Sequence, residues 1–229
     1  MPDALRCSAP TGAAWLELDG ERVALLPERA LWWPRTATLF VADVHLGKAA
    51  TYRALGVPVP ESTTASTLAT LSALFNQLDV RRVIWLGDLL HAREAQQPVV
   101  LDAVFAWRCR HAAIDMLLVR GNHDARAGYP PAKLAIPVVD EPLACGPFAA
   151  CHHPQHVPGM TVLAGHIHPA ITLRGAGHQR LRLPCYWWQP GMLILPAFGE
   201  FTGGVMLEAT GDARAWPVGG GAVWPAIRP

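Results

Sequence analysis

The sequence has few charged residues, no cysteine pair with metal or redox spacing, and no long apolar run. Only 16% of its 229 residues are Asp, Glu, Lys or Arg, and the formal net charge is +1. Disordered chains are usually more highly charged, so this composition argues against disorder. It also gives nucleic-acid binding no support from overall charge, although a local basic patch remains compatible with it.

The five cysteines are an odd number, and none lie in Cys-x-x-Cys spacing. No secretory signal opens the sequence, and no run reaches the ~18 apolar residues of a membrane helix. We therefore expect a cytoplasmic protein with reduced cysteines and no membrane association. There is no internal repeat. The length fits one domain over residues 1–229, with a loose N-terminal arm at 1–13 and an irregular C-terminal tail from about 215 to 229.

Apolar periodicity indicates strands and helices in alternation between residues 38 and 119. Runs of aliphatic and β-branched residues predict strands at 38–42, 82–86 and 116–119. Helical spacing predicts helices at 61–78 and 99–110, with a long connection at 46–60 and a polar loop at 91–98. This order favours a largely parallel sheet with right-handed crossovers.

Short strands dominate both ends of the chain. An Asp19-Gly20 turn between strands at 15–18 and 23–26 predicts a hairpin, and residues 30–33 add a strand. Beyond residue 135, strands separated by Gly and Pro are expected at 144–151, 161–164, 170–173, 180–184, 192–195 and 204–208. They predict a second sheet packed face to face on the first, with helices outside.

Metal-ligand side chains follow five of the predicted strands. They are Asp43 and His45, Asp88, Asn122 and His123, His152, and His166 and His168. Ligands bind at the carboxyl ends of strands in open α/β sheets, so we expect these groups to converge. His166 and His168 project to the same side of an extended chain, so each can reach a different ion.

This inventory suits the hydrolysis of phosphate esters. Two cations about 3.5–4 Å apart neutralise the phosphate oxygens and lower the pKa of a shared water. Such a pair needs a bridging carboxylate, further oxygen and imidazole ligands, and an acid for the leaving group. Glycines at 87, 121 and 165 permit tight turns that bring the backbone near the ions. The residues therefore predict a two-metal phosphoesterase.

The ordered set Asp-x-His, Gly-Asp, Gly-Asn-His-Asp, His and Gly-His-x-His over residues 43–168 resembles the calcineurin-like metallophosphoesterase superfamily. The resemblance implies an α/β fold, a four-layer sandwich of two packed mixed β-sheets flanked by helices. It also implies a first metal held by Asp43, His45 and His168, and a second held by Asn122, His152 and His166. Asp88 would bridge the ions, and His123 would be the general acid. His152 is preferred to His153 because it directly follows the strand.

A narrower set of motifs resembles the ligase-associated DNA-damage-response metallophosphoesterases, the PdeM family. The motifs are Asp-Val-His-Leu-Gly-Lys (43–48), Gly-Val-Pro-Val-Pro (56–60), Gly-Asp-Leu-Leu-His (87–91), Gly-His-Ile-His-Pro-Ala (165–170), Leu-Pro-Cys-Tyr (183–186) and Leu-Pro-Ala-Phe-Gly-Glu-Phe-Thr-Gly-Gly (195–204). The resemblance implies a manganese-dependent DNA endonuclease or phosphodiesterase that acts in DNA repair on single-stranded or structured DNA. By the same analogy it implies association with a DNA ligase and a helicase. Iron, nickel and zinc also accept such ligands.

Residue 91 departs from the broad superfamily pattern, which places Asp three residues after the bridging carboxylate. His91 stands there instead, as in the double-strand-break-repair nuclease branch of the superfamily. The expected mechanism is in-line attack by a hydroxide shared by the ions, while His123, oriented by His91, protonates the leaving group. Lys48, Tyr52, Arg53 or Arg126 would contact flanking phosphates or bases. The first three equally fit a solvated loop.

Two other functions fit part of this pattern. A hydrolase of nucleotide pyrophosphates or cyclic nucleotides would use the same metal site. A binding module could keep the fold without catalysis, but the full ligand set and the acid His123 argue against it. The Gly-Asp-x-Val-Asp-Arg-Gly pattern of the protein serine/threonine phosphatases is absent.

Overall fold

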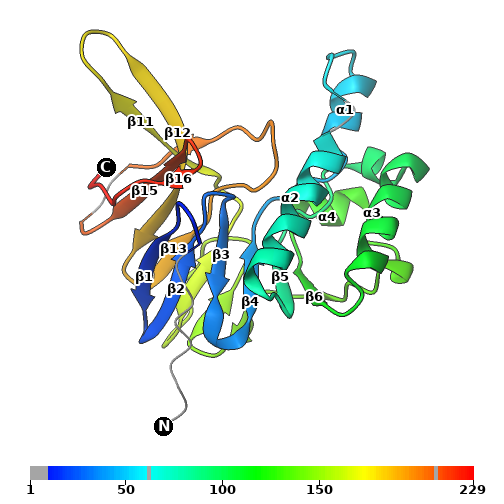
Figure 1. The fold of residues 1–229 in the computed structure, drawn as a ribbon, viewed down its shortest axis with the longest axis horizontal. Coiled ribbons are helices and arrows are strands. Elements are labelled where there is room, and N and C mark those ends of the chain that lie inside the picture. The colour runs from blue at the N-terminus through cyan, green and yellow to red at the C-terminus, as the bar shows by residue number, and fades with distance from the viewer. Residues whose placement is uncertain (1–9, 61–62, 209–210) are drawn as a thin grey trace.

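The protein consists of two packed β-sheets and a group of helices on one side (Figure 1). Its structure, a computed structural model, describes residues 10–60, 63–208 and 211–229. Most of the expected N-terminal arm, Cys7 and the first two residues of the helix expected at 61–78 lie outside the described residues.

The first sheet has seven strands that follow one another in sequence order. They are β1 (Ala14–Leu18), β2 (Glu21–Leu25), β3 (Ala30–Trp33), β4 (Thr38–Val41), β5 (Arg82–Leu86), β6 (Asp115–Val119) and β7 (Val138–Val139). Strands β1 to β4 pair antiparallel, whereas β4 to β7 pair parallel, as the alternation of strands and helices predicts. Asp19 and Gly20 both have positive φ, which a two-residue hairpin turn of type I′ requires.

The second sheet has the order β14-β11-β12-β13-β10-β9-β8, with β15 and β16 attached to β12. Its strands are β8 (Leu143–Cys145), β9 (Phe148–Ala150), β10 (Thr161–Ala164), β11 (Pro169–Arg174), β12 (Arg180–Gln189), β13 (Met192–Ile194), β14 (Val205–Met206), β15 (Arg214–Gly219) and β16 (Ala222–Val223). The single strand predicted at 144–151 is wrong, because a turn at Gly146 with φ of 59° separates β8 from β9.

The irregular tail predicted from about residue 215 is also wrong. Strand β15 runs antiparallel to β12, and Tyr186 lies opposite Trp216. Ala215, Trp216 and Val218 are buried in this pairing. Pro217 and the glycines that follow it hid the strand from pattern analysis, because such residues usually mark loops.

Among the described residues, four α-helices lie beside the first sheet: α1 (Lys48–Ala54), α2 (Thr63–Leu78), α3 (Pro98–Arg110) and α4 (Asn122–Ala127) (Figure 1). Short 3-10 turns occur at η1 (Pro34–Thr36), η2 (Arg93–Gln96) and η3 (Ala132–Leu134). Helix α1 occupies part of the predicted loop at 46–60, where it buries Ala49 and Ala50. Within the described parts of the chain, the helices are too short or too polar to cross a bilayer.

The core divides according to the alternation of side chains along the strands. Leu39 and Val41 of β4 pack toward the helices in one cluster, whereas Phe40 and Ala42 pack toward the second sheet in another. Phe148 and Leu163 contribute to this second cluster from β9 and β10. The predicted class, two packed mixed sheets with flanking helices, is confirmed.

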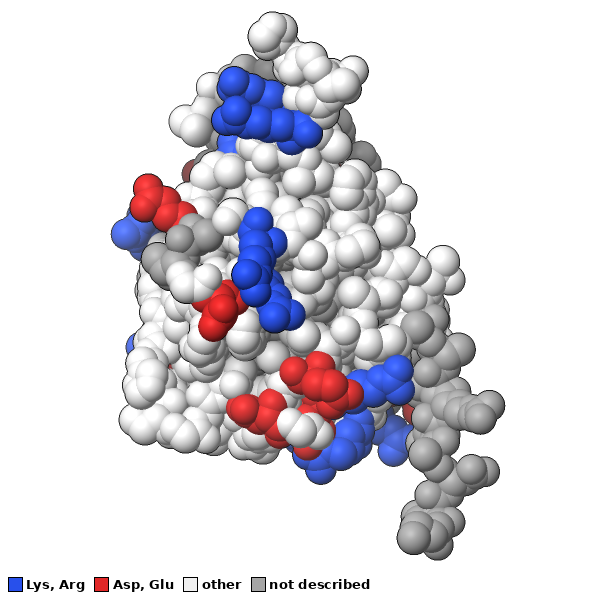
Figure 2. Space-filling view, turned by 90° about the vertical axis from the view of Figure 1, so that its left-hand side faces the viewer, with Lys and Arg blue, Asp and Glu red and all other residues white. Residues whose placement is uncertain are grey.

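Charge on the surface is sparse. Figure 2 shows the side that lies at the left of Figure 1, where Lys and Arg form separate patches in a mostly uncharged surface. One such patch lies at the top of this view, at the level of the long β11–β12 hairpin in Figure 1. The arrangement agrees with the low charged fraction of the sequence.

Candidate metal centre

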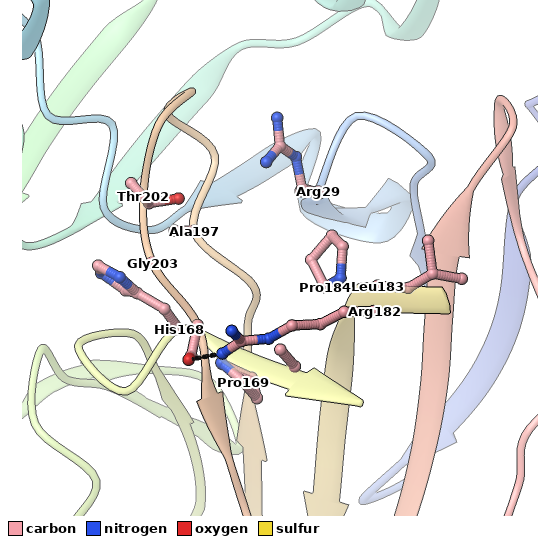
Figure 3. Close-up of a pocket in the computed structure, with 11 residues that line it drawn as sticks. Arg29, His168, Pro169, Arg182, Leu183, Pro184, Ala197, Thr202 and Gly203 are labelled. Carbon is pink, nitrogen blue, oxygen red and sulfur yellow. Dashed lines mark hydrogen bonds between the residues drawn. The ribbon is translucent and has the colours of Figure 1, made fainter. Parts of the chain in front are cut away.

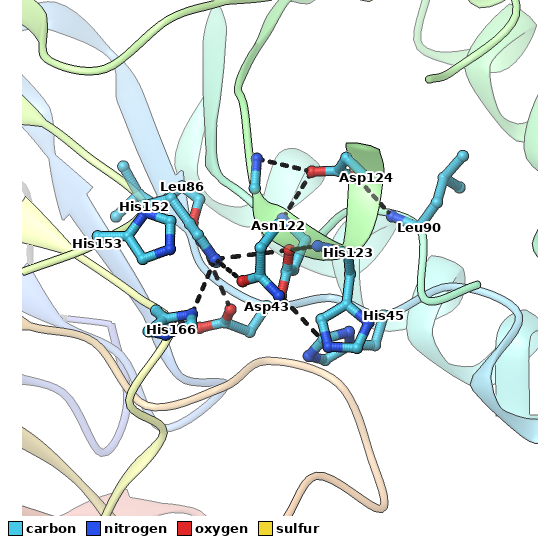
Figure 4. Close-up of polar contacts among 12 residues, drawn as sticks. Asp43, His45, Leu86, Leu90, Asn122, His123, Asp124, His152, His153 and His166 are labelled. Atoms are coloured by element: carbon cyan, nitrogen blue, oxygen red, sulfur yellow. Dashed lines mark hydrogen bonds and ion pairs between the residues drawn. The ribbon is translucent and has the colours of Figure 1, made fainter. Parts of the chain in front are cut away.

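Ligand-type side chains from both sheets meet at one edge of the sandwich (Figure 4). Strands β4, β5 and β6 end there, and so do β9 and β10 of the second sheet, which run parallel to each other. The side chains brought together are Asp43, His45, Asp88, Asn122, His123, His152, His166 and His168. The predicted convergence of the five motifs is therefore present in the fold.

The backbone at these strand ends is unusual. Positive φ angles occur at Asp43, His45, Asp88, His166 and His168. Left-handed conformations are uncommon for residues other than glycine and cost roughly 1–3 kcal/mol when strained. Their concentration at one edge indicates that the surrounding structure fixes these side chains in place for a purpose other than stability.

One cluster consists of Asn122, His152 and His166. His152 Nε2 lies 2.9 Å from Asn122 Oδ1 and 3.1 Å from His166 Nδ1. The His152 ring is fully buried, and its Nδ1 donates to the carbonyl oxygen of Leu86 at 3.0 Å. This is the set that the family resemblance assigns to the second metal.

The other cluster consists of Asp43, His45 and His168. Asp43 Oδ1 lies 3.4 Å from His168 Nε2, and His168 Nε2 lies 3.4 Å from His45 Nε2. Asp88 lies next to both clusters, since it groups with Asp43 and His152 and its Oδ1 is 3.5 Å from His152 Nε2. Asp88 thus lies near members of both clusters.

Several lone pairs face one another in this centre. Because Nδ1 of His152 donates to a carbonyl, the neutral ring presents an unprotonated Nε2 to Asp88 Oδ1 and Asn122 Oδ1, which are also acceptors. Asp43 Oδ1 is buried with no hydrogen-bond partner among the described residues. A buried carboxylate oxygen is costly unless a positive charge compensates it. Metal ions would satisfy all these groups together, so the donor set fits the divalent ions that the sequence predicts.

Burial keeps the imidazoles of His45 and His166 in their ligand form. Desolvation is the main cause that lowers the pKa values of His45 and His166, and at His45 the charge of Lys48 adds a smaller lowering. Burial likewise lowers the pKa of His91 to about 4. Neutral imidazole is the form that binds metals, so these rings need not lose a proton at pH 7.

His123 lies beside Asp88 and is only half-buried. Its backbone N–H donates to Asp88 Oδ1 at 2.8 Å, and its Nδ1 donates to the backbone carbonyl of His91 at 2.8 Å. The rings of His91 and His123 stack, with centroids 4.9 Å apart. His91 therefore orients His123 through its carbonyl oxygen and ring face, while His91 Nδ1 lies 3.3 Å from His45 Nδ1. The Nε2 atom of His123 lies 4.0 Å from Asp88 Oδ2.

The four predicted substrate-binding residues are dispersed. Lys48 lies close enough to Asp43 and Asp88 for their charges to raise its pKa, against a larger lowering by burial. Tyr52 packs near Lys48 on α1. Arg53 donates to the carbonyls of Val59 and Pro60, so it holds the connection after α1. Arg126 is exposed on α4. Of the four, the structure places Lys48 next to the metal centre.

Two carboxylates that the sequence does not predict as site residues hold the backbone around the metal centre in place. Glu141 accepts hydrogen bonds from the backbone N–H groups of His152 and His153 and from the His153 ring. No local sequence pattern indicates a role for Glu141, because its partners are eleven and twelve residues away. Asp124 ends the Gly-Asn-His-Asp motif, which is a signal that could have identified it.

Asp124 ties together the loops after β5 and β6. Its buried carboxylate accepts hydrogen bonds from the backbone N–H groups of Asp88 at 2.8 Å, Leu90 at 3.0 Å and Gly121 at 3.1 Å. Burial raises the pKa of Asp124 to about 7, although these donors act to lower it. The residue holds Asp88 in position without facing the metal clusters itself.

Replacing Asp124 with alanine is expected to destabilise the protein by about 3 kcal/mol or more, because three buried N–H groups lose their acceptor at about 1–3 kcal/mol each. Urea unfolding measures the loss. Asp140→Ala is the control, since Asp140 is exposed and its pair with Arg120 lies at the surface. Equal stabilities of the two variants would contradict this role of Asp124.

Comparison with known proteins identifies the family and related folds. The family model described as calcineurin-like phosphoesterase matches residues 36–184. The crystal structure of Pseudomonas putida nuclease MPE is 46% identical and superposes with a TM-score of 0.82, covering 93% of this chain and 99% of that chain. Yfce, a phosphoesterase from E. coli, is 13% identical with a TM-score of 0.44 over 83% of this chain and 98% of that chain, too distant to support an argument. No curated protein matches the chain.

Proposed function

The chain belongs to the calcineurin-like phosphoesterase family, and on that premise we propose that it is a two-metal DNA endonuclease. The family and the similarity to a nuclease make it a metal-dependent phosphoesterase. The observation that carries the two-metal part of the proposal is the set of opposed lone pairs around His152 Nε2 and Asp43 Oδ1, which calls for positive charge at the strand ends. The 46% identity to a nuclease favours nucleic acid as the substrate.

The two clusters supply ligands for two ions. Asp43, His45 and His168 would hold the first ion, and Asn122, His152 and His166 the second, with Asp88 shared between them. Bound there, two divalent ions would supply charge neutralisation of the phosphate and activation of the attacking water. Oxygen, amide and imidazole ligands suit Mn²⁺, and they also accept iron, nickel or zinc.

His123 would act as the general acid. Since its Nδ1–H donates to the His91 carbonyl, its Nε2 is the nitrogen that would deliver a proton to the departing oxygen. The hydrogen bond from its backbone to Asp88 ties this acid to the proposed bridging carboxylate. Stacking against His91 restrains the ring further, so the proton is held in a fixed position.

A nuclease assay with Mn²⁺ tests the proposal. We expect cleavage of a single-stranded oligonucleotide that requires added metal and stops with a chelator. A mononucleotide phosphodiester is the comparison substrate. Turnover of the mononucleotide ester alone would identify a small-molecule phosphodiesterase of the same family and contradict the nuclease proposal.

Neighbouring histidines provide a matched test of the second ion. His152→Ala is expected to remove one of two bound ions and to lower activity by ~100-fold or more, because its Nε2 lies at the centre of the cluster. His153→Ala should keep both ions, since the His153 ring is half-exposed and donates to Glu141. The metal content of the two purified variants, measured per protein chain, tests whether His152 or His153 is the ligand. Ion loss in His153→Ala with retention in His152→Ala would exchange the two assignments.

A role in DNA repair follows from the narrower family resemblance. The motifs at 56–60, 183–186 and 195–204 lie outside the metal ligands, so they distinguish this branch from phosphoesterases in general. We accordingly propose functional association with a DNA ligase and a helicase. Direct contact would be supported if either protein co-purified with this one in the absence of both metal and DNA.

A further inference from the structure

A cavity opens directly beside the metal centre, and His168 forms part of both. Its volume is about 250 Å³, close to the lower end of ligand pockets at ~300 Å³. The cavity lies between the β2–β3 turn, the start of β11, strand β12 and the loop that leads into β14 (Figure 3). Two of its lining residues are arginines, Arg29 and Arg182, and no Asp or Glu lines it.

Arg29 reaches this cavity from the turn between β2 and β3. It has a positive φ of 66°, and the turn is fixed by the buried hydroxyl of Tyr186, which donates to the carbonyls of Leu26 and Ala30 at 2.8 and 2.9 Å. The guanidinium makes no hydrogen bond or ion pair within the described ranges. Burial lowers the pKa of Arg29, although Tyr186 and Glu200 act to raise it, so part of its hydration is already lost.

Arg182 lies on the opposite wall. It extends from β12 and donates to the carbonyl oxygen of Gly204 (Figure 3). A guanidinium has five N–H donors, so this one contact leaves donors for a ligand. No Asp or Glu lines the cavity, although the charge of Glu200 reaches Arg29, so an anion bound between the two arginines would be attracted by both.

The third wall is attached to the metal centre. The loop 195–204 contributes Ala197, Thr202, Gly203 and Gly204 to the cavity. Its Phe198 and Gly199 N–H groups donate to the carbonyls of Ala42 and Asp43 at 2.9 and 3.1 Å. A side chain at Gly199 would collide with the Val44 carbonyl, so the loop packs tightly against the strand end that carries Asp43. The cavity is thus held at a fixed position relative to the proposed ions.

We propose that this cavity binds a phosphate of the nucleic-acid strand next to the phosphate that is cleaved, through Arg29 and Arg182. The inference rests on the proposed function and adds a substrate-binding subsite to it. It gives the loop 195–204 a role as the wall that joins this subsite to Asp43. A substrate with a single phosphate would fill the metal centre and leave the cavity empty.

Paired substrates test the subsite. Arg29→Gln and Arg182→Gln are expected to lower kcat/KM about 10-fold on a single-stranded oligonucleotide, mainly through KM, because each loses a charge-assisted contact. Activity on bis(p-nitrophenyl) phosphate, which has no flanking phosphate, should stay within about twofold of wild type. Arg180→Gln is the matched control, since Arg180 is exposed on the same strand and does not line the cavity.

Binding of a fluorescent oligonucleotide to metal-free protein gives a readout that does not depend on catalysis. We expect about 10-fold weaker binding in both variants and a salt dependence whose slope falls by about 0.7, the value for one single-strand phosphate. Arg29→Lys, which keeps the charge, should recover part of the affinity, and thermal unfolding checks that each variant folds.

The outcomes separate the two proposals. The subsite proposal would be overturned if Arg29→Gln and Arg182→Gln bound and cleaved the oligonucleotide as well as Arg180→Gln does. Equal losses of activity on both substrates would also overturn it. A wild-type protein that binds the oligonucleotide through Arg29 and Arg182 but cleaves neither substrate with any divalent metal would contradict the nuclease function and retain the subsite.

Discussion

Asp88→Ala is expected to lower phosphodiester hydrolysis by about 10³-fold, equivalent to about 4 kcal/mol of transition-state stabilisation. The Asp88 side chain is only 2% exposed, and its Oδ1 lies 3.5 Å from His152 Nε2. Because it lies next to both clusters, its removal would weaken both proposed ions together. The same oxygen accepts the backbone N–H of His123, so the acid would lose an anchor as well. Steady-state kinetics with Mn²⁺ measures the loss.

The variant Asp88→Asn separates the effect of losing the negative charge from the effect of losing the side chain. The amide keeps an oxygen acceptor for the His123 N–H but lacks the negative charge that a bridging ligand supplies. We expect its activity to be nearly as low as that of Asp88→Ala, with a smaller loss of stability. Asp115→Asn, at an exposed pair with Arg82, is the control for the substitution itself. Wild-type activity in Asp88→Ala would contradict the bridging role.

His123→Ala is expected to lower kcat on DNA by about 10²–10³-fold while both ions stay bound, since general acid catalysis contributes ~10²–10⁴-fold. The effect should be much smaller on bis(p-nitrophenyl) phosphate, because nitrophenolate leaves without a proton whereas a DNA alkoxide does not. The ratio of the two losses is therefore the informative quantity.

His178→Ala is the control for this substitution, as His178 is exposed near the tip of the β11–β12 hairpin. Metal content and kcat on both substrates are measured for each variant. Loss of an ion in His123→Ala would show that His123 is a ligand. Equal losses on both substrates would contradict its role as the acid.

The strand ends were predictable because each depends on local sequence. In the runs ending at Ala42, Leu86 and Val119, apolar residues alternate between two buried faces, and a polar ligand follows each run. Parallel pairing of these strands then places the ligands at one edge of the sheet. The convergence of Asp43, Asp88 and Asn122 therefore follows from pattern and topology together.

The other features of the fold and the site were not predictable from sequence, because they depend on contacts between residues far apart in the chain. Helix α1 was hidden by the glycines and prolines around it, although it buries Ala49 and Ala50. That His91 orients His123 through its backbone carbonyl could not be read from side-chain identities. The same holds for Arg29 and Arg182, which share a cavity only because Tyr186 fixes one turn and Gly204 faces the other arginine.

Anomalous diffraction from crystals soaked in Mn²⁺ would show directly whether two ions bind at these strand ends. We expect two peaks about 3.5–4 Å apart, one within bonding distance of Asp43 and His168, the other within bonding distance of Asn122 and His152, with Asp88 contacting both. A single peak away from Asp88, or no peak at these strand ends, would contradict this expectation.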